Sequence, residues 1–404
     1  INNIIAAANA GEATASAILN GTNAEAVEIK LKNNNRAYTS EGTDLKLQYT
    51  TENQSLTIGY RDTEDSEDRF QVYAYADWLN GQLGAMTVGS DPGYSSNNRV
   101  TKAQATAFYI NEEINFGALT VNLGYRSEDW EISQDRYVDA ARSAIATDKG
   151  YPKQLSDSDN SLMGFGATYE VNDTTQLFFG FHEGFTPTGG GADPEQADNL
   201  EMGVRYSDDN SYFEAVYFDT DYQNMFGECT ASGGATGSCE IGDSFNAGEA
   251  SISGFELVAQ TEMASDSGTK YPLSMVYTST DASFDNTFDS DFWGSVTSGM
   301  DIPDLPDSQL ALQAGFETQS GLRGSATYYA YGSTCSVASC AAGTSIDSYN
   351  VIDASLTKMF NDQLDVYMVV ENITDETDVV ARAPKNGARA QKPRSFTVGV
   401  RYRL

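Results

Sequence analysis

Apolar and polar side chains alternate along most of this chain from about residue 43 onward. In one segment Leu56, Ile58 and Tyr60 are separated by Thr57 and Gly59. A period of two is that of a β-strand whose two faces meet different surroundings, and it is not that of a helix. The same alternation recurs in segments 119–126, 163–170, 200–206, 310–317 and 364–371. The pattern predicts an all-β protein.

The alternating segments are longer than the strands of most soluble β-proteins. They run to about nine residues or more, whereas strands of soluble sandwiches typically have roughly five or six. A tilted strand needs roughly nine to eleven residues to cross a bilayer. Tyrosines such as Tyr49, Tyr60 and Tyr109 lie toward segment ends, where a ring and its hydroxyl can sit at the headgroup level. Length and tyrosine placement therefore predict a transmembrane β-barrel.

The connections between the segments alternate in length. Short connections lie near 51–54, 115–118, 172–174, 208–210, 264–269, 319–321 and 361–362. Long connections span about 62–99, 130–160, 186–198, 224–249, 284–307, 332–348 and 374–392. Tight periplasmic turns opposite long extracellular loops are typical of outer-membrane barrels. The alternation predicts an antiparallel, up-and-down barrel wall of about fifteen strands.

Fifteen is an odd number, and barrels of single bacterial chains normally have an even one. An open edge would also leave unpaired amides in lipid. We therefore expect the first strands of the wall to lie upstream of residue 1. Residues 1–42 are predicted to form a partial strand and an extracellular loop region, and residues 43–404 the barrel.

Charge and composition restrict the function further. The chain has 58 acidic and 24 basic residues, a formal net charge of -34, which argues against a nucleic-acid partner. No run approaches the roughly 18 consecutive apolar residues that a membrane helix needs, so a membrane role must be carried by strands. No nucleophile elbow, paired-acid motif or cofactor motif stands out, so we predict neither an enzyme nor a cofactor.

Candidate metal and cysteine chemistry is limited. The cysteines form two local pairs in loops, and we expect disulfides Cys229–Cys239 and Cys335–Cys340 in an oxidising compartment, with free cytosolic thiols as the alternative. His182 is the only histidine and predicts no metal site. Acidic stretches 62–68 and 284–291 lack the glycine and terminal glutamate of a calcium loop, so solvated charge is favoured there.

Three stretches resemble TonB-dependent outer-membrane receptors. Residues 370–377 and 392–404 are similar to the closing strands of that family, in which E-N-L-T-D precedes P-R-x-F-x-x-G-x-R. Residues 184–187 and 193–206 are similar to its G-F-x-P and N-x-E-x-G-x-R-Y patterns. Residues 34–42 and 59–70 resemble the ferric-dicitrate branch. The family has a TonB box and a plug inside 22 strands. We find neither in this sequence, so the chain corresponds to the last fifteen strands.

The resemblance implies a function. It is energy-dependent uptake of a ferric chelate, ferric citrate or another siderophore, across the outer membrane of a Gram-negative bacterium. The implied partners are the chelate, the TonB-ExbB-ExbD complex acting through a plug, outer-membrane lipid and lipopolysaccharide, and the barrel assembly machinery. The implied C-terminal assembly signal comprises Phe396, Val398, Val400, Tyr402 and Leu404. A passive, porin-like channel is the alternative, because such a barrel needs neither plug nor TonB.

An anionic chelate would require cationic side chains at the upper strand ends or loops, because a guanidinium pairs with two carboxylate oxygens at once. Four arginines and one glutamine are the candidates. They are Arg136, Arg142, Arg382, Arg389 and Gln196.

Overall fold

The computed structural model describes residues 2–94, 97–188, 193–228, 244–246, 248–290, 293–382 and 387–403.

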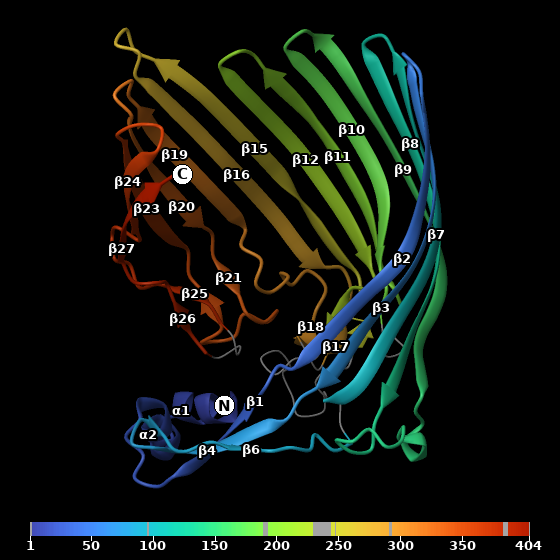
Figure 1. Ribbon diagram of the computed structural model, residues 1–404, viewed down its shortest axis with the longest axis vertical. Coiled ribbons are helices and arrows are strands. Elements are labelled where there is room, and N and C mark those ends of the chain that lie inside the picture. Colours follow the sequence, from blue (N-terminus) through green and yellow to red (C-terminus); the bar gives the residue numbers. More distant parts are fainter. Residues whose placement is uncertain are drawn as a thin grey trace.

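Fifteen antiparallel strands form one curved sheet, in which each strand pairs with its neighbours along the chain (Figure 1). The strands are β2 (Arg36–Thr50), β3 (Gln54–Phe70), β7 (Asn98–Phe116), β8 (Leu119–Arg136), β9 (Lys153–Asn172), β10 (Thr175–Thr186), β11 (Glu195–Ser207), β12 (Ser211–Gln223), β15 (Ala250–Ala264), β16 (Lys270–Phe284), β19 (Ser308–Glu317), β20 (Leu322–Tyr331), β23 (Tyr349–Met359), β24 (Leu364–Glu371) and β27 (Ser395–Tyr402). The predicted up-and-down arrangement and strand number are confirmed.

All seven predicted short connections join consecutive strands of the sheet at one end of the wall, which lies uppermost in Figure 1. Gly117 illustrates why a turn forms there. It links β7 to β8 with φ +69°, a conformation that is cheap for glycine and costly for residues with a Cβ.

Long connections lie at the other end and contain short hairpins and one 3-10 helix. The hairpins are β13 (Phe226–Glu228) with β14 (Ser244–Asn246), β17 (Phe288–Ser290) with β18 (Gly294–Val296), β21 (Thr334–Cys335) with β22 (Ser345–Ile346), and β25 (Val379–Ala381) with β26 (Arg389–Ala390). The 3-10 helix η1 covers Thr147–Lys149.

Several strands extend beyond their predicted ends on the long-connection side. β2 begins at Arg36 instead of residue 43, β3 continues to Phe70, and β8 and β9 reach Arg136 and Lys153. The predicted loops 62–99 and 130–160 were therefore too long. The acidic stretch 62–68 lies inside β3 and not in a loop. The extra segment of β3 carries polar side chains on both faces, so the sequence offers no apolar alternation there.

Strand length is uneven around the wall. β9 has 20 residues, whereas β24 and β27 have 8 each. The long strands belong to the part of the sheet from β2 to β9, and the short ones to the part from β19 to β27 (Figure 1).

Residues 2–32 and 73–88 form a small unit, the N-terminal cap, at the long-connection end (Figure 1). It contains helices α1 (Asn2–Asn9) and α2 (Ala13–Asn20) and strands β1 (Val27–Lys32), β4 (Tyr73–Leu79), β5 (Gln82–Leu83) and β6 (Thr87–Val88). The Trp78 indole donates to the carbonyl of Ile18 at 3.0 Å and ties α2 to β4. The expectation of a partial strand and loop did not include these helices, which an alanine-rich sequence favours.

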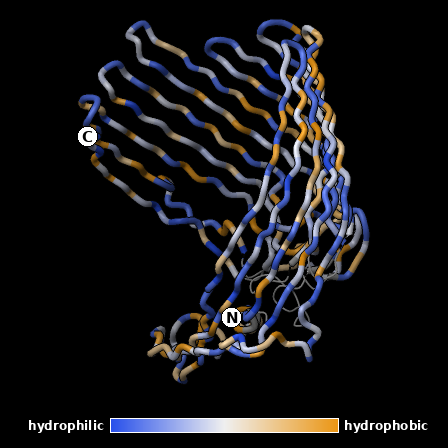
Figure 2. The backbone as a smooth tube through the Cα atoms, turned by 45° about the vertical axis from the view of Figure 1, so that its right-hand side comes forward, coloured by the Kyte–Doolittle hydropathy of each residue, from blue (hydrophilic) through white to orange (hydrophobic). Residues whose placement is uncertain are grey.

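The two faces of the sheet differ in chemistry. Hydrophilic and hydrophobic residues alternate along many of the strand segments in Figure 2. Outward side chains such as Leu47 and Val398 are 69% and 70% exposed. The buried apolar cluster of the described residues, which includes Ala250, Phe284 and Val296, lies instead at the long-connection end. The outward apolar face therefore has no second sheet packed against it within the described ranges.

The sheet ends in two free edges. Within the described strands, β2 pairs only with β3 and β27 only with β24, and the two edges lie apart in Figures 1 and 2. Every residue of β2 is exposed. None of the helices in the described ranges is of a length and hydrophobicity that would let it traverse a bilayer.

Candidate ligand site on the inner wall

The register from β2 to β8 fixes which side chains share a face. Leu47 lies opposite Ile58, Ile58 opposite Ile110, and Ile110 opposite Tyr125, and no bulge interrupts these three pairings. Directly opposed residues of neighbouring strands point to the same side of a sheet. These four residues therefore form one outward row, and residues an odd number of positions away point inward.

Four arginines form a second row on the inner face. Arg36 lies opposite Arg69, Arg69 opposite Arg99, and Arg99 opposite Arg136. Each lies eleven positions from the outward row on its own strand, toward the long-connection end. Eleven is odd, so these four residues, called the arginine row below, face inward.

Glu67 is the acid that pairs with this row in the described part of the chain. Its carboxylate lies 3.2 Å from the Arg36 guanidinium, 2.9 Å from that of Arg69 and 3.5 Å from that of Arg99. The side chains of Arg69 and Arg99 are only 5% and 10% exposed, whereas that of Arg36 is 31% exposed. Three cations therefore share one carboxylate, and two of them have little exposure to water.

Further cations surround the row. Burial, and then the positive charges of Arg69, Arg36 and Arg99, lower the pKa of Lys32 on β1. Lys30 places its Nζ 3.7 Å from the ring centre of Tyr73. The Nε of Arg99 is buried and donates to no acceptor within the described residues. The cluster thus holds more positive charge and more donors than its own residues satisfy.

Aromatic rings and hollows border the row. The guanidinium of Arg136 lies 5.1 Å from the ring centre of Tyr151, and Tyr151 lies 6.3 Å from Tyr94. A hollow of about 380 Å³ is lined by residues including Glu67 and Thr101. A second hollow, of about 240 Å³, lies closer to the short-turn end of the wall. Its lining includes Arg61, Ala103, Arg126, Trp130 and Pro187. The site therefore combines guanidinium groups, phenol rings and open space.

The candidate residues from the sequence do not gather in one place. Arg136 belongs to the arginine row. Arg142 lies at the opposite face of the same strands, where its Nη1 donates to Asp68 at 2.9 Å and its Nε to Asn98 at 3.2 Å. Gln196 lies opposite Phe185 and shares the outward register of β11 with Leu200.

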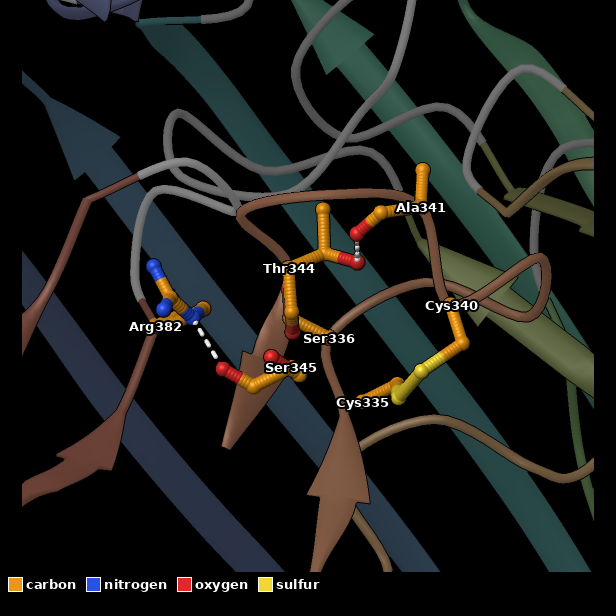
Figure 3. The surroundings of a disulfide bond; sticks show 7 residues. All are labelled: Cys335, Ser336, Cys340, Ala341, Thr344, Ser345 and Arg382. Carbon is orange, nitrogen blue, oxygen red and sulfur yellow. Dashed lines mark hydrogen bonds between the residues drawn. A yellow bond between two sulfur atoms is a disulfide. The ribbon is translucent and has the colours of Figure 1, made fainter. Parts of the chain in front are cut away.

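Arg382 and Arg389 lie near the other edge of the sheet, in the connection that contains β25 and β26. Arg382 donates its Nε to the carbonyl of Ser345 at 2.7 Å, so it ties two long connections together (Figure 3). The structure does not bring these two arginines together with Arg136, and their predicted role in ligand binding stays a prediction.

The predicted disulfide between Cys335 and Cys340 is present within the β21–β22 hairpin, where it joins β21 to the loop (Figure 3). Cys229 and Cys239 lie outside the described residues. Within the described ranges, no group of three or more His, Cys, Asp or Glu side chains is arranged to hold a metal ion.

Removing the Cys335–Cys340 bond, for example in a Cys335→Ser and Cys340→Ser variant, is expected to loosen only the surrounding loop. The bond closes a loop with a sequence separation of 5, so it removes little chain entropy compared with a bond across a long loop. Limited proteolysis should cut near residues 336–344 faster than in the unaltered protein, while the heat resistance of the sheet stays the same. A collapse of the whole sheet would contradict this expectation.

The C-terminal strand presents the predicted assembly residues outward. Phe396, Val398, Val400 and Tyr402 are 61% to 70% exposed on one face of β27, and Leu404 lies outside the described residues. Their role as an assembly signal stays a prediction.

The sequence analysis missed Arg36, Arg69 and Arg99. They lie far apart in the chain, and only the pairing register brings them into one row. One signal was available. Each lies at an odd offset from an apolar strand position and just before or after a long connection, in a chain with few basic residues.

Fold and inner wall together define an antiparallel β-barrel wall with an apolar outside, a polar inside and a cationic mouth. Residues 7–373 match the family model described as TonB dependent receptor-like, beta-barrel. The chain belongs to this family.

Several solved structures have a similar fold. The ferric yersiniabactin uptake receptor FyuA from Yersinia pestis matches with a TM-score of 0.66 and 17% identity, over 92% of this chain and 55% of that one. The siderophore receptor PiuA from Acinetobacter baumannii matches with a TM-score of 0.70 and 15% identity, over 92% and 56%.

The ferric citrate transporter FecA in its unliganded form has a TM-score of 0.64 and 17% identity, over 93% of this chain and 55% of that chain. At such identities the likeness shows the fold alone. This chain spans about half the length of these three proteins.

Proposed function

We propose that this chain forms most of the wall of an outer-membrane receptor that imports a ferric chelate, with TonB supplying the energy. Family membership is the observation that carries the proposal. The wall itself supports it. Its exposed apolar outward face suits contact with lipid, and its inward polar face suits a water-filled or plugged interior.

The ligand contacts are proposed to lie at the long-connection end, which would face the outside of the cell. The arginine row and its neighbouring hollows lie there. Ferric citrate and other siderophores are the proposed ligands. Lipopolysaccharide around the wall, the assembly machinery and TonB-ExbB-ExbD are proposed as partners through the family relationship.

Growth under iron limitation tests the function. A strain lacking the receptor gene should fail to grow when its cognate chelate is the sole iron source, and it should regain growth when the gene is restored. Individual ferric chelates, including ferric citrate, are supplied one at a time. Normal growth of the deletion strain on every chelate would contradict the proposal.

A second strain, lacking TonB but carrying the receptor, separates import from passive diffusion. Energy-dependent import predicts that growth on the cognate chelate is lost in this strain as well. A passive porin-like channel would leave chelate uptake unchanged without TonB, because diffusion through an open pore needs no energy source.

A further inference from the structure

The arginine row concentrates positive charge on a chain that is otherwise strongly acidic. The chain has 24 basic and 58 acidic residues, yet four arginines lie in one register across four adjacent strands. Like charges directly opposite each other destabilise a strand pair. With neighbouring strands roughly 4.8 Å apart, the row extends over about 14 Å. Glu67 offsets the repulsion among three of the arginines, but its single carboxylate leaves a net positive charge on the row.

We propose that the arginine row is an anion-binding site and that it takes ferric chelates whose outer groups are carboxylates or similar oxyanions. This inference rests on the import function proposed above and names the substrate class of that receptor. A guanidinium fork matches a carboxylate with two parallel hydrogen bonds. Arg36 and Arg136, at the ends of the row, are less buried than Arg69 and Arg99 and point to the same inner face.

The two middle arginines strengthen the site without needing to touch the ligand. Arg69 and Arg99 are about nine-tenths buried, so water screens their charge poorly. The single carboxylate of Glu67 offsets part of that charge. An arriving oxyanion supplies the compensation that the row lacks, and the unpartnered Nε of Arg99 marks this deficit.

Glu67 has a second consequence, because it competes with the ligand. Its carboxylate already holds the guanidinium groups of Arg36, Arg69 and Arg99 together. Replacing it with the neutral, nearly isosteric glutamine removes the competitor while leaving the cations in place. The same change removes the attraction that stabilises the row.

The place of the row favours an external ligand. It lies at the long-connection end of the wall, with the hollow that Glu67 and Thr101 help to line directly beside it. The rings of Tyr94 and Tyr151 add flat surfaces next to Arg136. An acidic segment of the protein itself, filling the barrel interior, is the competing occupant that the experiment must separate.

Two single variants of the purified full-length receptor test the proposal. The probes are ferric citrate and ferric triscatecholate, which are anionic, and a ferric trihydroxamate without negative charge. Arg99→Gln should weaken binding of both anionic probes by roughly tenfold, because it removes one poorly screened positive charge from the row, and it should keep or raise the heat resistance. Glu67→Gln should tighten anion binding and lower the heat resistance. Trihydroxamate binding, where present, should not change.

Lys270→Gln is the matched control. It removes one positive charge at the short-turn end, where Lys270 pairs with Glu262 at 2.7 Å, and it should leave anion binding unchanged. Fluorescence quenching measures affinity, and gel mobility after heating measures heat resistance. Unchanged anion affinity in Arg99→Gln overturns the proposal, and so does failure of the unaltered receptor to bind either anionic probe.

Lower heat resistance of Arg99→Gln with unchanged anion affinity would overturn the proposal. It would indicate that the row binds an acidic segment of the protein itself and not a chelate. The import function is judged separately. If deletion strains grow on every chelate while Arg99→Gln still loses affinity for anions, the import function fails and the anion site stands.

Discussion

Replacing Arg403 with alanine is expected to lower the free energy of unfolding by roughly 2 kcal/mol, because it leaves a buried carboxylate without its nearest cation. Asp365 on β24 is fully buried, and the Arg403 guanidinium lies 2.9 Å from its Oδ2. Arg401 is the other described cation near it, at 3.9 Å. No described group donates a well-aligned hydrogen bond to either carboxylate oxygen, so charge attraction is its main compensation. Urea unfolding of the receptor in lipid vesicles measures the change.

The matched variant combines Arg403→Ala with Asp365→Asn. Removing the buried charge as well should recover most of the lost stability, because an uncharged amide costs less to bury than an unpaired carboxylate. Equal losses in the single and double variants would show that the Arg403 side chain acts instead through its hydrogen bond to the carbonyl of Asp362.

Replacing Gly59 with alanine is expected to cost roughly 1–3 kcal/mol, the usual range for overpacking. Gly59 faces inward on β3, directly opposite Tyr109, whose ring lies over it, and a Cβ at Gly59 would overlap that ring. The ring would have to leave its position beside the Arg126 guanidinium, which is 6.0 Å from its centre. Heat resistance on gels and urea unfolding both report the loss.

Gly180→Ala is the control for this prediction. Gly180 also faces inward, on β10, and a Cβ there would meet no atom within 4 Å. This variant should be as stable as the unaltered receptor, or slightly more stable. A second check adds Tyr109→Ala to Gly59→Ala, since without the ring the new methyl group has nothing to overlap. If Gly59→Ala costs the same with and without Tyr109, the overlap is not the cause.

The fold was largely predictable because lipid and water differ so strongly as surroundings. Apolar residues such as Ile58 and Ile110 alternate with polar ones where one face is outward and the other inward, and this contrast is visible in the sequence. The contrast ends where both faces meet water. That is why the acidic stretch 62–68 was predicted as a loop although it continues β3 to Phe70.

The site was predictable only in part. Arg136 was among the candidates because it is basic and borders a long connection. Its partners in the row depend on register, since a shift of one residue in any pairing would move Arg69 or Arg99 to the opposite face. Nothing in a single sequence states that register. The pairing of Arg142 with Asp68 was hidden for the same reason, since 74 positions separate them.

Tyr367 shows how structure resolves an exception in the pattern. Among the inward positions of the closing strands, which are mostly small or charged, this large ring breaks the rule. It lies over Gly399 on the adjacent strand, and the Arg401 guanidinium is 5.6 Å from its centre. The missing side chain of the glycine makes room for the ring, as Gly59 does for Tyr109.

The unequal heights of the strands give the mouth of the wall a slanted rim. The side built from β7, β8 and β9 rises well above the side that ends at β24 and β27. In the proposed receptor, a chelate that reaches the mouth from the side of the short strands would meet the longer strands on the opposite side. Arg99 and Arg136 lie on these longer strands, so the proposed anion site would face a chelate that arrives from the side of the short strands.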